Sequence, residues 1–573
     1  ADVLFVAEAP SDSEDRAGRM LTGDAGRLLL QALAEYGIDQ YRVAIVKAVR
    51  CSPPADKAPS VKQARACAPY LSADIEALKP RFIVPLGNVA LKSLTGMTGV
   101  TKVVGRQIPH ESGAVVFPMI SPAAVLNNEA MLPVFESGFE MLARALEGKA
   151  ADTTGAAFEE STLDEFIAAL DRIAARKATF AVDIETEPRP EYAHFPEAVF
   201  NPKFGKMRTI AVAWADTDAE RSLCVAWTRL VDLTPTQNSK FIMAMRRLLR
   251  SGAFMVAHNA PFEVKWFLHH FNIKRGEYWP VEDTLLFHYL LDENQTHGLE
   301  VVAAQYTAMG GYDNAVALLL AQGKKHHEMP IDVLGRYNAG DALATYKAWV
   351  KMRPLLRNHA GLWRAWSVGL GPSIFPVAWS ELHGRKVDYN ALETRRAAWK
   401  REGMESLAAV LDNDAVGEYE AARAAGDRPL KGGFNPNSAQ QMGDLLFGVL
   451  GVPVAGRTEG GAASVKAEFL EPYKDKYPII ADYLNYKGRG KALEKLAEAE
   501  YYTAPDSFLY GSYMIFGTVT GRWSSANPNL QNYAKEVREI FVPRRPDWVF
   551  VEADYSQLEL RLIADAAQCR VLL

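Results

Sequence analysis

Two blocks of the chain alternate short apolar runs with helical stretches, and this alternation restricts the fold more than any other feature. From residue 1 to about 145, the runs DVLFVA, RVAIVKAV and RFIVPLG are separated by AGRLLLQALAEYG and VKQARACAPYLSADIEALK. A second pattern of this kind includes ATFAVDIETE and RTIAVAWAD. In the first block, this alternation predicts a parallel α/β sheet. We therefore expect two α/β domains.

The remainder of the chain has a different pattern. After residue 360 long helical stretches dominate, and strand character returns near the end at WVFVEADYS. VEADYS alternates like a strand, so we expect a buried strand with Asp554 at its edge. A chain of 573 residues is too long for one hydrophobic core. The expected organisation is multidomain, with domains at 1–146, 163–360 and 361–573 and a linker at 147–162.

Composition excludes several classes of protein. The net charge of −5 gives no overall basic field, so any nucleic-acid binding must depend on local Lys and Arg. Four cysteines are too few for a disulfide framework and fit a reducing, cytoplasmic setting. No apolar run reaches the ~18 residues that would predict a membrane span. We expect a monomer that does not associate with membranes.

Polar side chains recur at short spacings in the second block. Asp183 and Glu185 are two apart on an expected strand, so they share a face. Asn259 and Glu263 are four apart and share a face if their segment is helical. Each acid alone is more simply explained as a surface charge or a helix cap.

The same block adds Tyr337 and Asp341, four apart on an expected helix, and Asp283 in VEDTLLFHYLL. Clustered carboxylates repel one another unless cations lie between them, and oxygen ligands suit Mg²⁺ or Mn²⁺. Two such ions ~4 Å apart can activate water and stabilise the leaving oxygen of a phosphodiester. Together these residues favour a two-metal nuclease site.

The order D-x-E, N-x-x-F-E and Y-x-x-x-D resembles the motifs of DnaQ-like 3′→5′ exonucleases, which have an RNase H-like α/β fold. It is most similar to the exonuclease domain of bacterial DNA polymerase I. The resemblance implies that Tyr337 positions the attacking water and that Asn259 and Asp283 lie on the substrate-binding side. It implies four metal ligands: Asp183, Glu185, Glu263 and Asp341. The family usually has Asp where this chain has Glu263, so we expect reduced activity or an altered metal preference.

The third block carries TVTGRWSSANPNLQN (518–532), VREIFVP and VEADYSQLELR. These motifs resemble family-A DNA polymerases, and the resemblance covers roughly 365–573. FNPNSAQQMGDLLF and YLNYKGRGKALEKL are similar to that family's thumb. The implied structure is a helical thumb with part of an α+β palm. Neither RxxxKxxxFG nor HDE occurs in the sequence, so we expect the chain to be a fragment of a longer polymerase, without fingers and without the second palm carboxylate.

The polymerase resemblance implies roles for individual residues. Asp554 would hold Mg²⁺ against the triphosphate, and Glu559 would exclude a ribose 2′-OH. The other residues expected on the substrate side are Arg522, Asn529, Gln531, Asn532, Tyr555 and Gln557. Two simpler interpretations stay open: a salt bridge within the palm for Arg522, and an ordinary ion pair between Glu559 and Arg561.

The first block resembles family-4 uracil-DNA glycosylases through LFVAEAPSDSEDRAGRMLTGDAGRLL, RFIVPLGNVALKSL and ISPAAVL. Glu8 keeps the acidic position of the first motif. Leu21 replaces the stacking Phe, Lys47 the uracil-reading Asn, and Ser121 the His of the HPA motif. Because base removal needs stacking, hydrogen-bonded reading and anion stabilisation, we expect an inactive module that contacts DNA or serves structure.

Family-4 members also bind an iron–sulfur cluster through four cysteines. Only Cys51 and Cys67 match, as the second pair, and four thiolates are normally needed. A cluster in this chain alone is therefore not expected, and inert thiols are the simpler interpretation.

The leading hypothesis is a family-A DNA polymerase with a proofreading exonuclease, acting in replication of the bacteriophage type. The implied cofactor is Mg²⁺ or Mn²⁺, and the implied partners are a primer–template, dNTPs and replication accessory proteins. Three alternatives remain: an exonuclease whose polymerase region only binds primer–template, a uracil-DNA repair glycosylase, and a DNA-binding scaffold.

Overall fold

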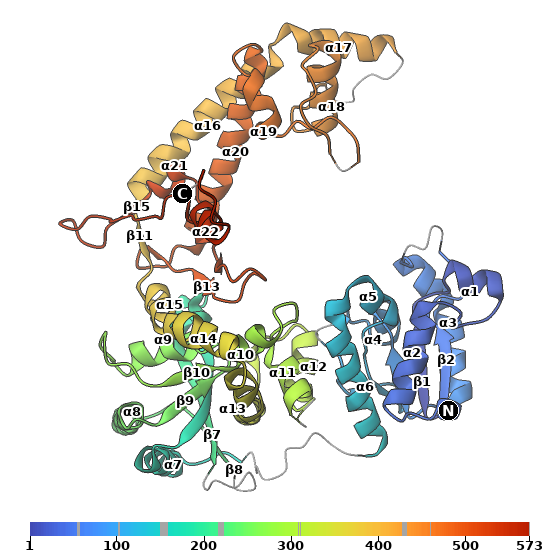
Figure 1. Cartoon of the computed structure of the whole chain (residues 1–573), viewed down its shortest axis with the longest axis vertical. Helices are drawn as coiled ribbons and strands as arrows, with labels where there is room; N and C mark the ends of the chain where they lie inside the picture. The colour runs from blue at the N-terminus through green and yellow to red at the C-terminus, as the bar shows by residue number, and fades with distance from the viewer. Residues whose placement is uncertain are drawn as a thin grey trace. The chain divides into compact units, whose positions relative to one another are not determined.

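The computed structural model describes residues 1–53, 58–100, 103–148, 159–215, 223–307, 309, 311–426, 433–458 and 460–571. Most of the expected linker, 149–158, lies outside these residues. The chain forms two compact units (Figure 1). One comprises Ala1–Leu382 with Tyr513–Ser524, and the other comprises His383–Ser512 with Ser525–Leu573.

The first domain of the first unit contains a five-stranded sheet in the order β2-β1-β3-β5-β4. Its strands are β1 (Val3–Ala7), β2 (Val43–Lys47), β3 (Phe82–Pro85), β4 (Ile108–Pro109) and β5 (Val115–Val116). All neighbours pair in parallel except β4 and β5. The expectation of a parallel α/β sheet is confirmed.

Helices cover both faces of this sheet because successive side chains of a strand point to opposite faces. The helices are α2 (Asp24–Glu35), α3 (Val61–Leu78), α4 (Asn88–Thr95), α5 (Pro122–Asn127) and α6 (Leu132–Leu146). Phe5 of β1 lies in one core with Leu29 of α2 and Phe139 of α6. Leu4, its neighbour, lies in the other core with Leu71 of α3.

The second domain has a mixed sheet in the order β10-β9-β6-β7-β8. The strands are β6 (Thr179–Pro188), β7 (Gly205–Ala215), β8 (Leu223–Arg229), β9 (Phe254–Ala257) and β10 (Val281–Asp283). The pairs β6–β7 and β7–β8 are antiparallel, and the pairs β6–β9 and β9–β10 are parallel. The sheet is thus only partly parallel, because the hairpins from β6 to β8 reverse the chain.

Two layers of helices enclose this sheet. Val182 and Val212 pack in the core formed with α7 (Leu163–Arg176), α8 (Pro235–Arg250) and α9 (Pro261–His270). On the opposite face Ala181 packs with residues of α11 (Leu299–Tyr306) and α13 (Ile331–Arg357). Small alanine side chains let α13 approach the sheet closely, which brings this helix to the strand that carries Asp183.

The second unit is largely helical. Long helices α16 (Tyr389–Leu411) and α20 (Pro478–Tyr502) run side by side (Figure 1). Shorter elements α17 (Asp414–Ala425), α18 (Ala439–Gly443) and α19 (Ala467–Leu470) adjoin a separate core that contains Tyr419, Met442 and Leu470. A small antiparallel sheet has the order β12-β11-β15, formed by β12 (Phe508–Leu509), β11 (Arg385–Val387) and β15 (Phe541–Val542).

The expectation of a buried strand at VEADYS is wrong. Residues 549–555 form no strand, and Val549 and Val551 are 80% and 89% exposed. A strand needs a neighbour to take up its backbone hydrogen bonds, and no described strand pairs with this segment. The chain then forms α22 (Leu558–Ala566).

None of the described helices combines the length and the apolar character needed to cross a membrane.

Candidate metal centre

Three carboxylates from two distant segments meet beside the mixed sheet of the second domain. Asp183 and Glu185 lie two apart on β6, and Asp341 lies on α13, which packs against that strand. One carboxylate oxygen from each of the three lies within 4.8 Å of the others. The predicted strand spacing is confirmed, and so is the helical spacing of Tyr337 and Asp341.

Burial and mutual repulsion make negative charge on these three carboxyl groups unfavourable. Burial and the Glu185 carboxylate raise the pKa of Asp183 well above its ordinary value, and burial and Asp341 do the same for Glu185. Burial and Asp183 likewise raise the pKa of Asp341. Without a cation, the three groups therefore resist simultaneous ionisation.

Neighbouring polar groups hold the cluster in place. Asn338 donates its side-chain amide to Asp183, and the hydroxyl of Tyr312 donates to Asp341. A hydrogen bond from Tyr337 lowers the pKa of Asp341, against the larger effect of burial. Burial and the Asp341 charge raise the pKa of the Tyr337 hydroxyl well above 10, so this group stays protonated and can donate.

Sequence reasoning missed Asn338 and Tyr312. Asn338 lies three residues before Asp341, which places it on the same helix face, and that spacing was the available signal. Tyr312 comes from a turn outside the three motifs, and nothing in its sequence context indicates a contact with Asp341.

Glu263 lies in the first turn of α9 and is 2% exposed. Burial and the nearby Asp183 carboxylate raise its pKa. Its Oε2 is buried without a hydrogen-bond partner among the described residues. Although Glu263 lies near Asp183, it is outside the group of three whose oxygens lie within 4.8 Å of one another.

The condition under which Asn259 and Glu263 would share a helix face is not met. Helix α9 begins at Pro261, and Asn259 precedes it with φ at +69°. This left-handed conformation is tolerated by Asn better than by most residues, and it ends the helical spacing there.

The Asp283 carboxylate is held in place by backbone groups around it. It is buried and accepts hydrogen bonds from the backbone N–H groups of Asn259, Ala260, Leu285 and Leu286. It caps helix α10 (Thr284–Leu291) and ties that helix to the turn before α9. Burial raises its pKa to about 6 despite these four bonds. Its predicted contact with substrate stays a prediction.

The residues present fit divalent cations. Three carboxylate oxygens that could bind a metal lie close together. A fourth carboxylate nearby, Glu263, has a buried oxygen without a hydrogen-bond partner among the described residues. Hard oxygen ligands of this number suit Mg²⁺ or Mn²⁺, and buried like charges are otherwise unfavourable. When bound, such ions would lower the pKa of water and stabilise a developing alkoxide.

The predicted polymerase residues do not gather in this way. Asp554, Tyr555, Gln557 and Glu559 are exposed, and no acidic cluster other than the one at Asp183 occurs among the described residues. Asn529 caps the short turn Leu530–Asn532 by accepting from the backbone N–H of Gln531 at 3.2 Å. Arg522 belongs to the segment Tyr513–Ser524 of the first unit.

Two of the replaced glycosylase positions meet at one partly buried carboxylate. Lys47 Nζ lies 2.9 Å from Glu14 Oε2, and the backbone N–H of Leu21 donates to Glu14 Oε1 at 2.7 Å. The Lys47 and Glu14 side chains are each 11% exposed. Burial opposes ionisation of Glu14, but hydrogen bonds from Ser11 and Lys47 outweigh it and lower the pKa. Glu14 thus links two of the replaced positions, Lys47 through an ion pair and Leu21 through its backbone N–H.

The remaining glycosylase positions are engaged as well. Ser121 Oγ accepts from the backbone N–H of Ala124 and caps α5. Glu8 Oε1 accepts from Val89 N at 3.0 Å and lies against Gly87, where an added Cβ would come within 2.6 Å of that oxygen. Cys51 is exposed and Cys67 half-buried, and both are free thiols.

Comparison with known families matches three stretches of the chain to three families. Residues 1–147 match the uracil DNA glycosylase superfamily, 157–357 match a 3'-5' exonuclease family, and 406–573 match DNA polymerase family A. The chain therefore combines a region that matches DNA polymerase family A with an exonuclease-family region and a uracil-DNA-glycosylase-like region ahead of it.

Individual relatives match either nearly the whole chain or one part of it. A DNA polymerase of Bacillus phage SP01 is 27% identical over 98% of this chain and 67% of its own length. The type-4 uracil-DNA glycosylase of Sulfurisphaera tokodaii is 35% identical over 25% of this chain and 69% of its own length. The chain spans about 30% of the length of the bacterial DNA polymerase I relatives that it matches.

One solved structure shares the fold. The POL domain of Pol1 from M. smegmatis, in complex with DNA primer-template and dNTP, matches with a TM-score of 0.50 and 19% identity. The match covers 71% of this chain and 62% of that chain.

Proposed function

We propose that this chain removes nucleotides from DNA 3′ ends at the Asp183 centre and takes part in template-directed DNA synthesis through its polymerase region. The observation that carries the proposal is the convergence of Asp183, Glu185 and Asp341 from β6 and α13 on one point. Asp183, Glu185, Glu263 and Asp341 would hold one or two Mg²⁺ or Mn²⁺ ions. The bacterial and phage relatives favour action on a primer–template in the cytoplasm of a bacterial or phage-infected cell.

The chain's own groups would perform the remaining steps. Tyr337, kept protonated by burial, would orient the attacking water. Asn338 fixes the Asp183 carboxylate, and Asp283 holds the turn that carries Asn259. In the polymerase region Asp554 would be a metal ligand and Glu559 the group that selects deoxynucleotides.

A second candidate function, an exonuclease whose polymerase region only grips DNA, is favoured by one contrast. Three exonuclease-domain carboxylates are assembled, whereas Asp554 is exposed and belongs to no group of three possible metal ligands among the described residues. Under either function, we propose a replication accessory protein as a further partner of the chain.

A 5′-labelled primer–template separates the two functions. With Mg²⁺ alone, we expect shortening of the primer by the wild-type chain and none by Asp183→Ala. With Mg²⁺ and dNTPs, extension by Asp183→Ala supports synthesis, and its loss in Asp183→Ala/Asp554→Ala assigns it to Asp554. Shortening without extension supports the exonuclease alone. Shortening that persists in Asp183→Ala contradicts the proposed centre.

A further inference from the structure

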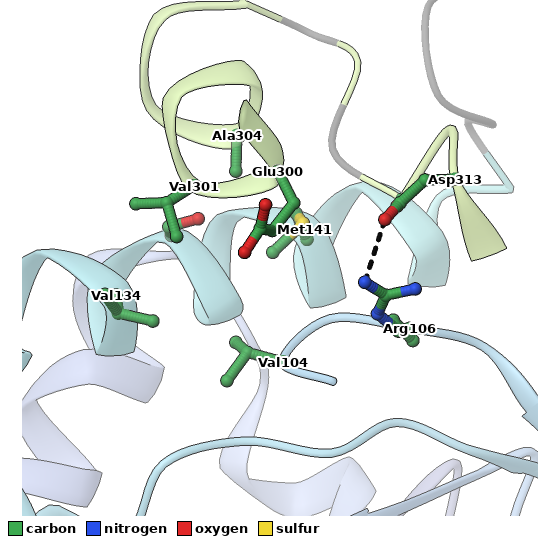
Figure 2. Close-up of a pocket in the computed structure, with 10 residues that line it drawn as sticks. Val104, Arg106, Val134, Met141, Glu300, Val301, Ala304 and Asp313 are labelled. Carbon is green, nitrogen blue, oxygen red and sulfur yellow. Dashed lines mark ion pairs between the residues drawn. The ribbon is translucent and has the colours of Figure 1, made fainter. Parts of the chain in front are cut away.

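The glycosylase-like domain meets the exonuclease domain along α6 and α11. Val301 of α11 lies in the same core as Val134 and Phe135 of α6, so apolar packing is continuous across the contact. Figure 2 shows α11 above α6, with Met141 and Glu300 beside each other between the two helices. This surface of the glycosylase-like domain therefore has a partner inside the same chain.

An enclosed ion pair lies at the edge of this contact. Arg106, from the turn before β4, lies 2.8 Å from Asp313 of the exonuclease domain, and each side chain is only 11% exposed (Figure 2). The neighbouring Gly105 has φ of +73°, and an added Cβ would lie 2.3 Å from Met141 Cε, so the turn fits closely on α6. A close, enclosed pair of this kind fixes the two segments that carry it relative to each other, because separating the charges is unfavourable.

The residue next to Asp313 reaches the metal centre. Tyr312 donates its hydroxyl to the Asp341 carboxylate. Its ring lies against Gly340, where an added Cβ would come within 2.6 Å of ring carbon Cδ2. The ring is thus confined by α13, and its hydroxyl orients one of the three clustered carboxylates.

We propose that the glycosylase-like domain serves as a positioning element for the exonuclease centre: Arg106 holds Asp313, and Tyr312 beside it orients Asp341 for divalent-cation binding. The inference deepens the proposed exonuclease function and rests on it. Outer partners of a metal ligand commonly change metal affinity or activity by about 10–100-fold when they are removed. In this proposal Arg106 acts through Asp313 and Tyr312, and Tyr312 acts through Asp341.

The test measures Mn²⁺ binding by electron paramagnetic resonance of the free ion, with hydrolysis of a labelled 3′ end as a second readout. Every protein is the full chain with Asp554→Ala, which removes the polymerase-region carboxylate. We expect Tyr312→Phe and Arg106→Ala to raise the Mn²⁺ dissociation constant about tenfold. The charge-swapped double variant Arg106→Asp/Asp313→Arg should restore most of the affinity lost in Arg106→Asp.

A matched control is Arg42→Ala, which removes an exposed ion pair with Asp2 in the same domain and should leave binding unchanged. Asp313→Asn keeps the size of the side chain and tests the same contact if Arg106→Ala does not fold. If Arg106→Ala and Asp313→Asn bind Mn²⁺ like Arg42→Ala while Asp183→Ala does not bind it, the inference is overturned and the proposed centre stands. If Asp183→Ala binds Mn²⁺ and hydrolyses DNA normally, the proposed centre itself is wrong.

Discussion

Lys265 Nζ lies 2.7 Å from Glu381 Oε2, and both side chains are less than a tenth exposed. The second oxygen of Glu381 accepts from the backbone N–H of Tyr513 at 2.7 Å. Tyr289 donates its hydroxyl to the Thr518 carbonyl oxygen a few residues further along. The helix that carries Glu263 is thereby joined to the segment that leads to Arg522.

This bridge predicts a large loss of stability when one partner is removed. Glu381→Ala leaves Lys265 as an unpaired buried cation, so we expect the free energy of unfolding to fall by about 3 kcal/mol. Glu405→Ala removes the exposed ion pair with Arg401 and should change the free energy of unfolding by less than about 0.5 kcal/mol. Chemical denaturation followed by tryptophan fluorescence measures both. Equal effects of the two substitutions would show that the buried bridge is not stabilising.

Acid sensitivity should depend on His270. Burial lowers the pKa of this imidazole to about 3, against 6.5 in an unfolded chain. Its neutral form therefore stabilises the fold above pH 6.5, and this stability is lost as pH falls toward 3, by about 1.4 kcal/mol per pH unit. His270→Phe cannot take up that proton, so its stability relative to wild type should rise between pH 6.5 and pH 5. A difference that stays constant over this range would contradict the buried neutral imidazole.

Mg²⁺ should stabilise the chain more at pH 8 than at pH 5. The pKa values of Asp183, Glu185 and Asp341 are raised above 3.8 and 4.5 by burial and mutual repulsion. In chelator, the stability due to their protonated forms is present below those unfolded values and lost as pH rises through the folded ones. Mg²⁺ binds the ionised forms, and at 100 times its dissociation constant it adds about 2.7 kcal/mol. Melting temperatures with Mg²⁺ and with chelator, at both pH values, measure this effect, and Asp341→Asn should reduce it.

The glycosylase-like domain should leave uracil in DNA. Lys47 is engaged with Glu14, and Ser121 caps α5, so neither position offers the uracil-reading or anion-stabilising group. A uracil-containing oligonucleotide incubated with the full chain and then heated in alkali should stay intact. An active uracil-DNA glycosylase provides the positive control. Strand breakage above background would mean that this domain retains catalysis.

Much of the fold could be predicted because local pattern and tertiary environment agree. Buried strands such as Val3–Ala7 read as apolar runs, and Tyr337 and Asp341 fell on one helix as their spacing predicted. The segment 549–555 failed because its alternation indicates a strand only when a neighbouring strand is present, which local sequence cannot show.

The carboxylate cluster was predictable for a different reason. Asp183 and Glu185 lie on a strand and Asp341 lies on a helix. In such regular elements, residue spacing indicates which side chains share a face. Asn259 lies outside α9 because it has a left-handed backbone conformation itself, just before the helix begins. Tyr312 could not be found because it reaches Asp341 through tertiary packing alone.

Anomalous diffraction from crystals soaked in Mn²⁺ tests the central claim most directly, because it locates the ion without reference to activity. The carboxylates of Asp183, Glu185 and Asp341 should surround a Mn²⁺ peak at ligand distances of about 2.0–2.3 Å. Crystals of Asp183→Asn, grown and soaked alike, should show a weaker peak or none. A wild-type map with no peak among these three side chains, under conditions in which the protein shortens DNA, would contradict the account.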